Sequence, residues 1–200
     1  LIGVCLGISS IKFALDQNYN LAVIFLILAA ILDTLDGRIA RLIKGTSEFG
    51  KELDSLTDFV SFGIAPAFIL YFWELKNYGK IGWAITLIFS VCCVLRLARF
   101  NLTKIYENAE WKRNYFEGVP SPAGAILILL PLIYELSGFQ LNLDIKKFTP
   151  YLVIAVAILL ISNIPTFSLK KIKVSSKLTI FLLFGIVVIF VSLIFFTFKA

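Results

Sequence analysis

The sequence contains no histidine, no methionine and only three cysteines among its 200 residues. Without histidine, the commonest catalytic base and soft-metal ligand are both absent, so a bound metal would have to be held by oxygen atoms. The odd cysteine count and the lack of a C-x-x-C pattern exclude a disulfide framework, and we expect packed, reduced thiols. No initiator methionine precedes the apolar run that begins at Leu1, and we therefore expect residues upstream of Leu1 to be missing.

Charged residues are also scarce, at 16% of the chain, whereas 59% of the residues are hydrophobic and the mean hydropathy is +0.90. This composition excludes an ordinary soluble domain and indicates an integral membrane protein. The polar connections are too short to hold a separate soluble domain. We therefore predict one all-α membrane domain over residues 1–200, with membrane lipid rather than nucleic acid as its surroundings.

Apolar runs long enough to cross a bilayer, or nearly so, predict about seven transmembrane helices. They lie at residues 1–15, 21–43, 52–74, 80–102, 121–138, 148–165 and 177–198. Most of the 19 lysines and arginines fall on the side that holds the connections after the second, fourth and sixth helices. By the positive-inside rule this side is cytoplasmic, so the chain is predicted to be a multi-pass protein of the plasma membrane.

Four aspartates interrupt the membrane-like sequence near that cytoplasmic side, at Asp33, Asp36, Asp54 and Asp58. Four uncompensated carboxylates at bilayer depth would cost on the order of 10 kcal/mol, so cations are expected among them. We call these four residues the acidic cluster. Two successive helices carry these aspartates, each on one face. On an ideal helix, the residues of the first face fall within an arc of roughly 140° and those of the second face, on the next helix, within about 80°. The first face holds Asp33, Asp36, Gly37, Ala40 and Arg41, and the second holds Gly50, Asp54 and Asp58.

If the two helices are antiparallel neighbours, both faces can line one cavity at the cytoplasmic end of the bundle. Carboxylates without histidine or thiolate suit hard cations such as Mg²⁺ or Mn²⁺, with Ca²⁺ also possible. Two such ions could clamp a diphosphate, Arg41 could take a phosphate oxygen, and a free carboxylate could act as a base. Two other interpretations stay open: intramembrane salt bridges, and a carboxylate-lined ion or proton transporter.

The spacing Asp33-x-x-Asp36-Gly37-x-x-Ala40-Arg41, eight residues, then Gly50-x-x-x-Asp54-x-x-x-Asp58 resembles the signature of the CDP-alcohol phosphotransferase (phosphatidyltransferase) family. The resemblance implies a six-helix core, here with one helix more, that forms homodimers through membrane helices. It implies that the acidic cluster ligates two divalent metals and that Asp58 is also the general base. It implies that a CDP-lipid is bound by Gly37, Ala40, Arg41 and Gly50.

Three further stretches resemble the phosphatidylserine synthase branch of that family: LDSLTDFVSFGIAPA at 53–67, RLARFN at 96–101 and FEGVPSPAGA at 116–125. This implies a transferase of phospholipid biosynthesis that moves a phosphatidyl group from CDP-diacylglycerol, or an ether-lipid equivalent, to L-serine. The serine carboxylate needs a cation, preferably a guanidinium. The candidates for binding serine are Arg96, Arg99, Asn101 and Ser121. Glycerol phosphate and inositol phosphate are alternative acceptors.

Overall fold

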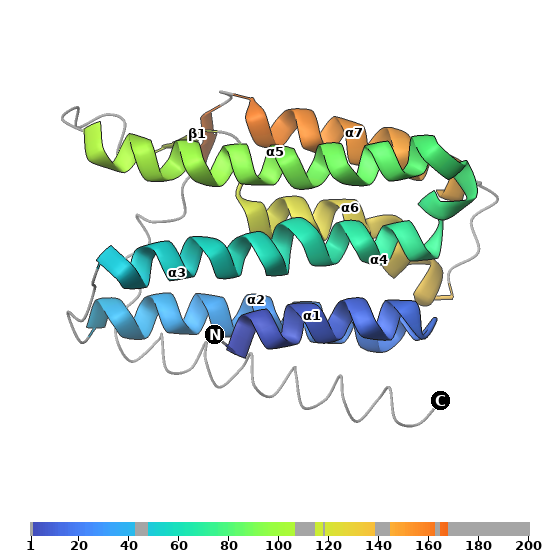
Figure 1. The fold of residues 1–200 in the computed structure, drawn as a ribbon, viewed down its shortest axis with the longest axis horizontal. Coiled ribbons are helices and arrows are strands. Elements are labelled where there is room, and N and C mark those ends of the chain that lie inside the picture. The colour runs from blue at the N-terminus through green and yellow to red at the C-terminus, as the bar shows by residue number, and fades with distance from the viewer. Residues whose placement is uncertain are drawn as a thin grey trace. The chain divides into compact units, whose positions relative to one another are not determined.

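The computed structural model describes residues 2–42, 48–106, 115–117, 119–138, 145–162 and 165–167. Within these ranges only the backbone is described at residues 36–42, 48, 51, 102–106, 115–117 and 165–167. The elements are α1 (Ile2–Leu15), α2 (Tyr19–Leu42), α3 (Glu48–Asp58), the π-helix η1 (Phe59–Ile64), α4 (Ala65–Trp73), the 3₁₀-helix η2 (Leu75–Tyr78), α5 (Gly79–Tyr106), β1 (Tyr115–Glu117), α6 (Ser121–Leu136), α7 (Ile145–Ile161) and β2 (Pro165–Phe167). The chain divides into two compact units, Leu1–Thr166 and Phe167–Ala200, and the first is described below (Figure 1).

The predicted all-α class is confirmed for the described residues, apart from β1 and β2. Helices occupy six of the seven apolar runs, whereas the run at 177–198 lies outside the described residues. Two stretches of the described chain, Glu52–Trp73 and Leu75–Asn101, are long and apolar enough to cross a membrane. These features fit a membrane protein, while the count of seven spans and their orientation stay predictions.

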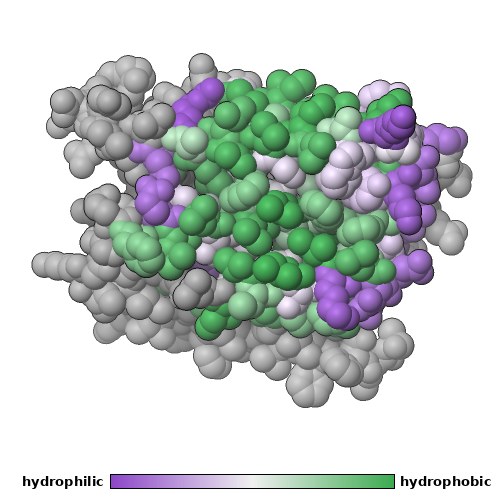
Figure 2. All heavy atoms as spheres, in the orientation of Figure 1, coloured by the Kyte–Doolittle hydropathy of each residue, from purple (hydrophilic) through white to green (hydrophobic). Residues whose placement is uncertain are grey.

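The outward surface of α5 supports a membrane environment independently of its length. Large apolar side chains are exposed along most of this helix, among them Ile81, Leu87, Ile88, Val91 and Leu95. Figure 2 shows a broad hydrophobic area on this face, with hydrophilic residues at its two ends. A continuous apolar patch of this kind is rare on proteins that face water. The pattern fits helices whose outer side contacts lipid.

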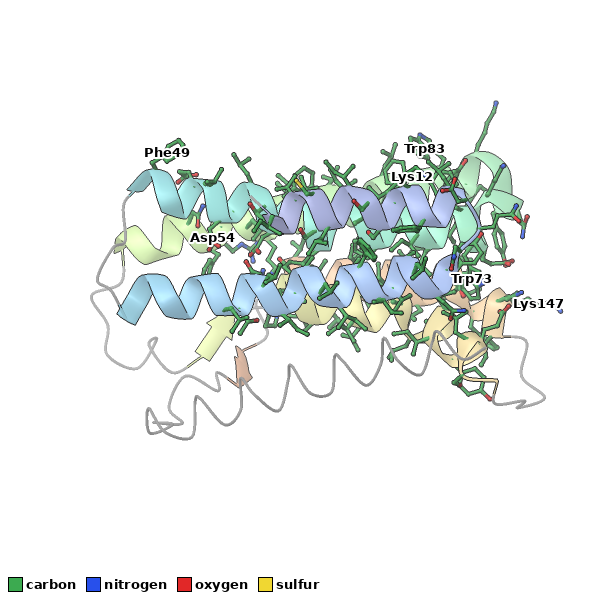
Figure 3. The ribbon with its side chains drawn as sticks, turned by 90° about the horizontal axis from the view of Figure 1, so that it is seen from below. Lys12, Phe49, Asp54, Trp73, Trp83 and Lys147 are labelled. Carbon is green, nitrogen blue, oxygen red and sulfur yellow. The ribbon has the colours of Figure 1, made fainter. Side chains whose placement is uncertain are left out.

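Successive helices, with α3 to α4 counted as one, run in opposite directions along the bundle, so their connections gather at its two ends (Figure 1). Helix α2 ends and α3 begins at one end, where α5 also finishes. Figure 3 places Phe49 and Asp54 toward this end and places Lys12, Trp73, Trp83 and Lys147 toward the other. Asp54 of the acidic cluster therefore lies away from the Trp- and Lys-containing end.

The two short strands are the departure from the all-α prediction. Strands β1 and β2 pair in a two-stranded sheet, and each is only three residues long. The segment after β1 also joins α7, because the Val119 N–H donates to the Leu159 carbonyl at 3.5 Å. Backbone groups of connecting segments need partners when they leave the helices, and this short pairing supplies some of them. Hydropathy carries no signal for such a pairing.

Helices α3, η1 and α4 form one continuous helix whose middle is a π-turn. In η1 the Ala65 N–H donates to the Val60 carbonyl, five residues back, and Pro66 lies in the first turn of α4. Proline has no N–H to continue the α-helical ladder, and a π-turn is one of the ways in which a helix accommodates the break. The π-turn begins directly after Asp58, at the acidic cluster.

Helix α1 packs closely against this stretch through small residues. A Cβ on Gly3 would lie 3.1 Å from Thr57 Cγ2, and a Cβ on Gly7 would lie 3.2 Å from the Ser61 Cα. The Ser61 hydroxyl donates to the Gly3 carbonyl at 3.2 Å. Small residues four apart on both helices let the backbones approach, as is common between membrane helices. This packing holds the helix that carries Asp58 against α1.

Candidate active site

Helix α2 supplies the first side of the site. It continues without a break to Leu42, so Asp33, Asp36, Gly37, Ala40 and Arg41 share one face of a single helix, as the spacing predicts. The Asp33 side chain is half-buried. From Asp36 onward the side chains of α2 lie outside the described part of the chain.

Helix α3 supplies the second side, and it runs antiparallel to α2 (Figures 1 and 3). Gly50 and Asp54 are exposed, while Asp58, the last residue of α3, is half-buried. Figure 3 shows Asp54 on the side of α3 that faces α2. Asp54 thus points from α3 toward the helix that carries Asp33.

Asp58 of α3 is the residue that contacts the α2 side of the site. Its carboxyl group lies within hydrogen-bonding range of the Asp33 carboxyl group and within electrostatic range of Asp54 and Arg96. Its Oδ1 atom is buried and has no hydrogen-bond partner among the described residues. Two carboxylates held side by side away from water repel each other unless a proton or a cation lies between them. The arrangement therefore favours a proton or a cation shared by these oxygens.

The available metal donors in this region are carboxylates. In the described part of the chain, no group of three or more His, Cys, Asp or Glu side chains is arranged to hold a metal ion. Asp36, which would add a fourth carboxylate, lies one turn from Asp33 on α2, and its side chain is outside the described residues. The donors that are present are all carboxylate oxygens, which are the ligands of Mg²⁺, Mn²⁺ and Ca²⁺. The chemistry of these oxygens thus suits a hard divalent cation, while the carboxylates of the described residues do not by themselves form a group of three around one ion.

Helix α5 places a buried cation within electrostatic range of Asp58. The Arg96 side chain is only 9% exposed, and its Nη1 donates to the Ser121 hydroxyl in the first turn of α6. The guanidinium also lies over the Phe100 ring, 6.0 Å from the ring centroid. Its Nε is buried without a partner among the described residues. Arg96 and Ser121 thus lie together beside the acidic cluster, with a donor still available.

The other two serine-binding candidates have different surroundings. Arg99 donates from Nη1 to the carbonyl of Ile161, the last residue of α7, at 2.8 Å. A cation at a helix C-terminus satisfies the final carbonyls and interacts favourably with the helix dipole. Asn101 donates from Nδ2 to the Ser55 hydroxyl at 3.0 Å, which joins α5 to α3. These contacts connect helices around the site.

Cys93 is a neighbour of the site that the sequence patterns did not single out. It is fully buried, and its thiol contacts the Ser121 hydroxyl and lies within electrostatic range of Arg96 and Asp58. All three cysteines are free, as expected, although Cys5 is exposed rather than packed. The spacing of Cys93 and Arg96, three residues apart on one helix, was the available signal, since such residues share a face.

The chain is similar to known proteins over nearly its whole length. The family model described as CDP-alcohol phosphatidyltransferase matches residues 1–198. The chain belongs to this family. It is therefore an enzyme of the CDP-alcohol phosphatidyltransferase family, and the resemblance inferred from the motif is confirmed.

Several curated members of the family are similar to the chain over most of its length. A Helicobacter pylori protein named CDP-diacylglycerol–serine O-phosphatidyltransferase is 36% identical over 192 residues, covering 96% of this chain and 77% of its own length. A Mycobacterium leprae protein of the same name is 40% identical over 175 residues, covering 87% of this chain and 58% of its own. A third, from Methanocaldococcus jannaschii, is 38% identical over 137 residues, covering 68% and 59%.

Proposed function

We propose that the chain transfers a phosphatidyl group from CDP-diacylglycerol, or its ether-lipid equivalent, to the hydroxyl of L-serine. The similar proteins of three distant organisms all carry the name of this serine transferase. The observation that carries the proposal is that Asp58 lies close to both the Asp33 carboxylate and the buried Arg96 guanidinium. This arrangement offers a base and a carboxylate-binding cation side by side.

The proposed reaction is an in-line displacement at phosphorus. The serine hydroxyl oxygen forms a bond to the phosphorus of the phosphatidyl group, and the bond from that phosphorus to the oxygen of CMP breaks. The leaving oxygen takes the bonding electrons, so CMP departs as an anion. Asp58, whose Oδ1 lacks a partner among the described groups, takes the proton of the hydroxyl. The products are phosphatidylserine and CMP.

The family is generally dependent on divalent cations. Here we assign two, Mg²⁺ or Mn²⁺ with Ca²⁺ as a further possibility, to the oxygens of Asp33, Asp36, Asp54 and Asp58. When bound, such ions supply the positive charge that a diphosphate and its transition state need. Asp33 and Asp58 already bring their carboxyl groups together, which supports this assignment. We assign Gly37, Ala40, Arg41 and Gly50 to the CDP-lipid, with the small residues leaving room and Arg41 binding phosphate oxygens.

The acceptor side of the site is assigned to Arg96 and Ser121. Because Ser121 accepts from Nη1, the guanidinium is held in one orientation while Nε is left available for an incoming carboxylate. A buried guanidinium also disfavours acceptors that carry no negative charge, since the cation would stay unpaired. Arg99 and Asn101, which were also candidates in the sequence, are better supported as residues that join the helices around the site.

Glycerol phosphate and inositol phosphate also carry an anion, so they are the acceptors to compare with serine. The test is a panel: detergent-solubilised protein receives CDP-diacylglycerol, Mn²⁺ and one alcohol at a time, and released CMP is measured. Release with serine alone supports the proposal. Release with glycerol phosphate or inositol phosphate and none with serine would assign the chain to another branch, and no release with any alcohol would favour transport.

The surroundings of the reaction follow from the same assignment. A lipid substrate and a soluble amino acid must meet near the headgroups, and the acidic cluster lies toward one end of the bundle (Figure 3). We propose that this end faces the cytoplasm, that the protein resides in the plasma membrane and that it forms a homodimer through its membrane helices. The basic residues near this end support the orientation through the positive-inside rule.

A further inference from the structure

The π-turn after Asp58 changes which residues of the helix face α5. In an uninterrupted α-helix, residues five apart point about 140° away from each other, whereas residues four apart share a side. Phe62 would then follow Asp58 on the same side. A π-turn closes its hydrogen-bonded ring over five residues instead, so Gly63 follows Asp58. The hydrogen bond from the Ala65 N–H to the Val60 carbonyl identifies this wider turn.

The contacts agree with this change of side. Asp58 lies within electrostatic range of Arg96 on α5, and a Cβ on Gly63 would meet Cys93 of the same helix at 3.1 Å from Sγ and 3.2 Å from Cβ. The Ser90 hydroxyl also donates to the Gly63 carbonyl at 3.4 Å. Asp58 and Gly63 therefore both face α5. Phe62 is also buried, at 1% exposed.

The glycine is the feature that permits the approach of the two helices. Any side chain at position 63 would press on Cys93, which contacts Ser121, which in turn accepts the hydrogen bond of Arg96. The same Cβ would lie 2.9 Å from the Phe59 ring, and Phe59 directly follows Asp58. A change at Gly63 is thus transmitted to both the base and the guanidinium.

We infer that Gly63, brought to the α5 side of the helix by the π-turn, is a positioning residue that sets the distance between Asp58 and Arg96. Through that distance it determines how well the acceptor alcohol is held for attack. The inference rests on the proposed function, because Asp58 and Arg96 are taken there as the base and the acceptor-binding cation. Gly63 itself contacts neither substrate.

The experiment measures steady-state kinetics of Gly63→Ala with the acceptor that supports CMP release by the wild-type enzyme. The expected result is an acceptor KM raised by about ten-fold, with the KM for the CDP-lipid changed by less than about two-fold, since misplacing a binding group by a fraction of an ångström has effects of this size. A Gly63→Ala enzyme with an unchanged acceptor KM, or with both KM values raised equally, would overturn the inference.

A size-swapped variant separates positioning from general damage to the fold. Combining Gly63→Ala with Cys93→Gly moves the crowding group from one helix to the other, and it is expected to restore the acceptor KM to within about three-fold of the Cys93→Gly single variant. Failure of the double variant to restore it would also overturn the inference. If Gly63→Ala does not fold, Cys93→Val tests the same contact, with the same rise expected and an unchanged acceptor KM counting against it.

Gly124→Ala is the matched control, because its Cβ would crowd only the end of the Leu160 side chain, at 2.9 Å, between α6 and α7. It is expected to lower the melting temperature and leave the acceptor KM unchanged. A similar rise in acceptor KM in this control would mean that any crowded glycine has the effect, which would overturn the assignment to Gly63. Because the acceptor is chosen from wild-type activity, failure of serine as acceptor would refute the proposed function and leave this comparison intact.

Discussion

The carboxyl groups of Asp33 in α2 and Asp58 at the end of α3 lie within hydrogen-bonding range of each other. One Asp58 oxygen is buried and has no partner among the described groups. Such a pair is unfavourable by itself, because like charges in a poorly hydrated site repel. We expect a bound cation to offset this repulsion and the unpartnered Asp58 oxygen to accept the proton of the acceptor hydroxyl.

The Asp58→Asn variant is expected to lower kcat by about 10²- to 10⁴-fold, because the amide cannot accept the hydroxyl proton. Binding of CDP-diacylglycerol and the melting temperature are expected to stay close to those of the wild type. CMP release and a lipid-binding assay measure the two effects. Glu52→Gln, which changes an exposed carboxylate two turns away on the same helix, serves as the control with wild-type turnover. Near wild-type kcat in Asp58→Asn would refute the role as base.

Removal of divalent ions is expected to stop CMP release, and adding Mg²⁺ or Mn²⁺ is expected to restore it. Binding to the folded state also raises stability, by about 2.7 kcal/mol at a concentration 100 times the Kd. The wild type should therefore melt at a higher temperature with Mg²⁺, whereas Asp33→Asn should gain little. Without ions, Asp33→Asn should be at least as stable as the wild type, because the repulsion with Asp58 is gone. Equal Mg²⁺-induced shifts in both proteins would contradict the assignment.

Arg96 and Arg99 are expected to respond differently to substitution by alanine. Loss of the Arg96 guanidinium should raise the serine KM by about 10- to 100-fold, which corresponds to one charge-assisted hydrogen bond. Loss of Arg99 removes its contact with the Ile161 carbonyl, so the melting temperature should fall while the serine KM changes little. Kinetics and thermal unfolding of both variants check this. A raised serine KM in Arg99→Ala together with an unchanged serine KM in Arg96→Ala would indicate that the acceptor binds near α7 instead.

The packing of α1 on the helix of Asp58 gives a prediction about stability. Gly7→Ala places a Cβ 3.2 Å from the Ser61 backbone, which cannot move as easily as a side chain. The expected cost is about 1–3 kcal/mol of unfolding free energy. Ser9→Ala, at a partly buried position of the same helix whose hydroxyl bonds only within α1, is the control. Unfolding in mixed detergent micelles measures both, and equal stability of Gly7→Ala and the wild type would argue against this close contact.

The helices and the faces of α2 and α3 could be predicted because both depend on local periodicity. Apolar runs place six helices, and the spacing of Asp33, Asp54 and Asp58 brings carboxylates toward one another. The π-turn could not be predicted in this way, because it depends on packing against α1 and α5 as well as on Pro66. Nor could the sequence separate Arg96 from Arg99, since the two lie three residues apart on similar sides of α5 and only their neighbours differ.

Phosphatidyl transfer to serine is tested by measuring the incorporation of labelled L-serine into lipid by purified protein supplied with CDP-diacylglycerol and Mn²⁺. We expect a serine-containing phospholipid formed in equal amount to the CMP released, with neither product formed by Asp58→Asn. Release of CMP without incorporation of serine, or equal incorporation by wild type and Asp58→Asn, would contradict this expectation.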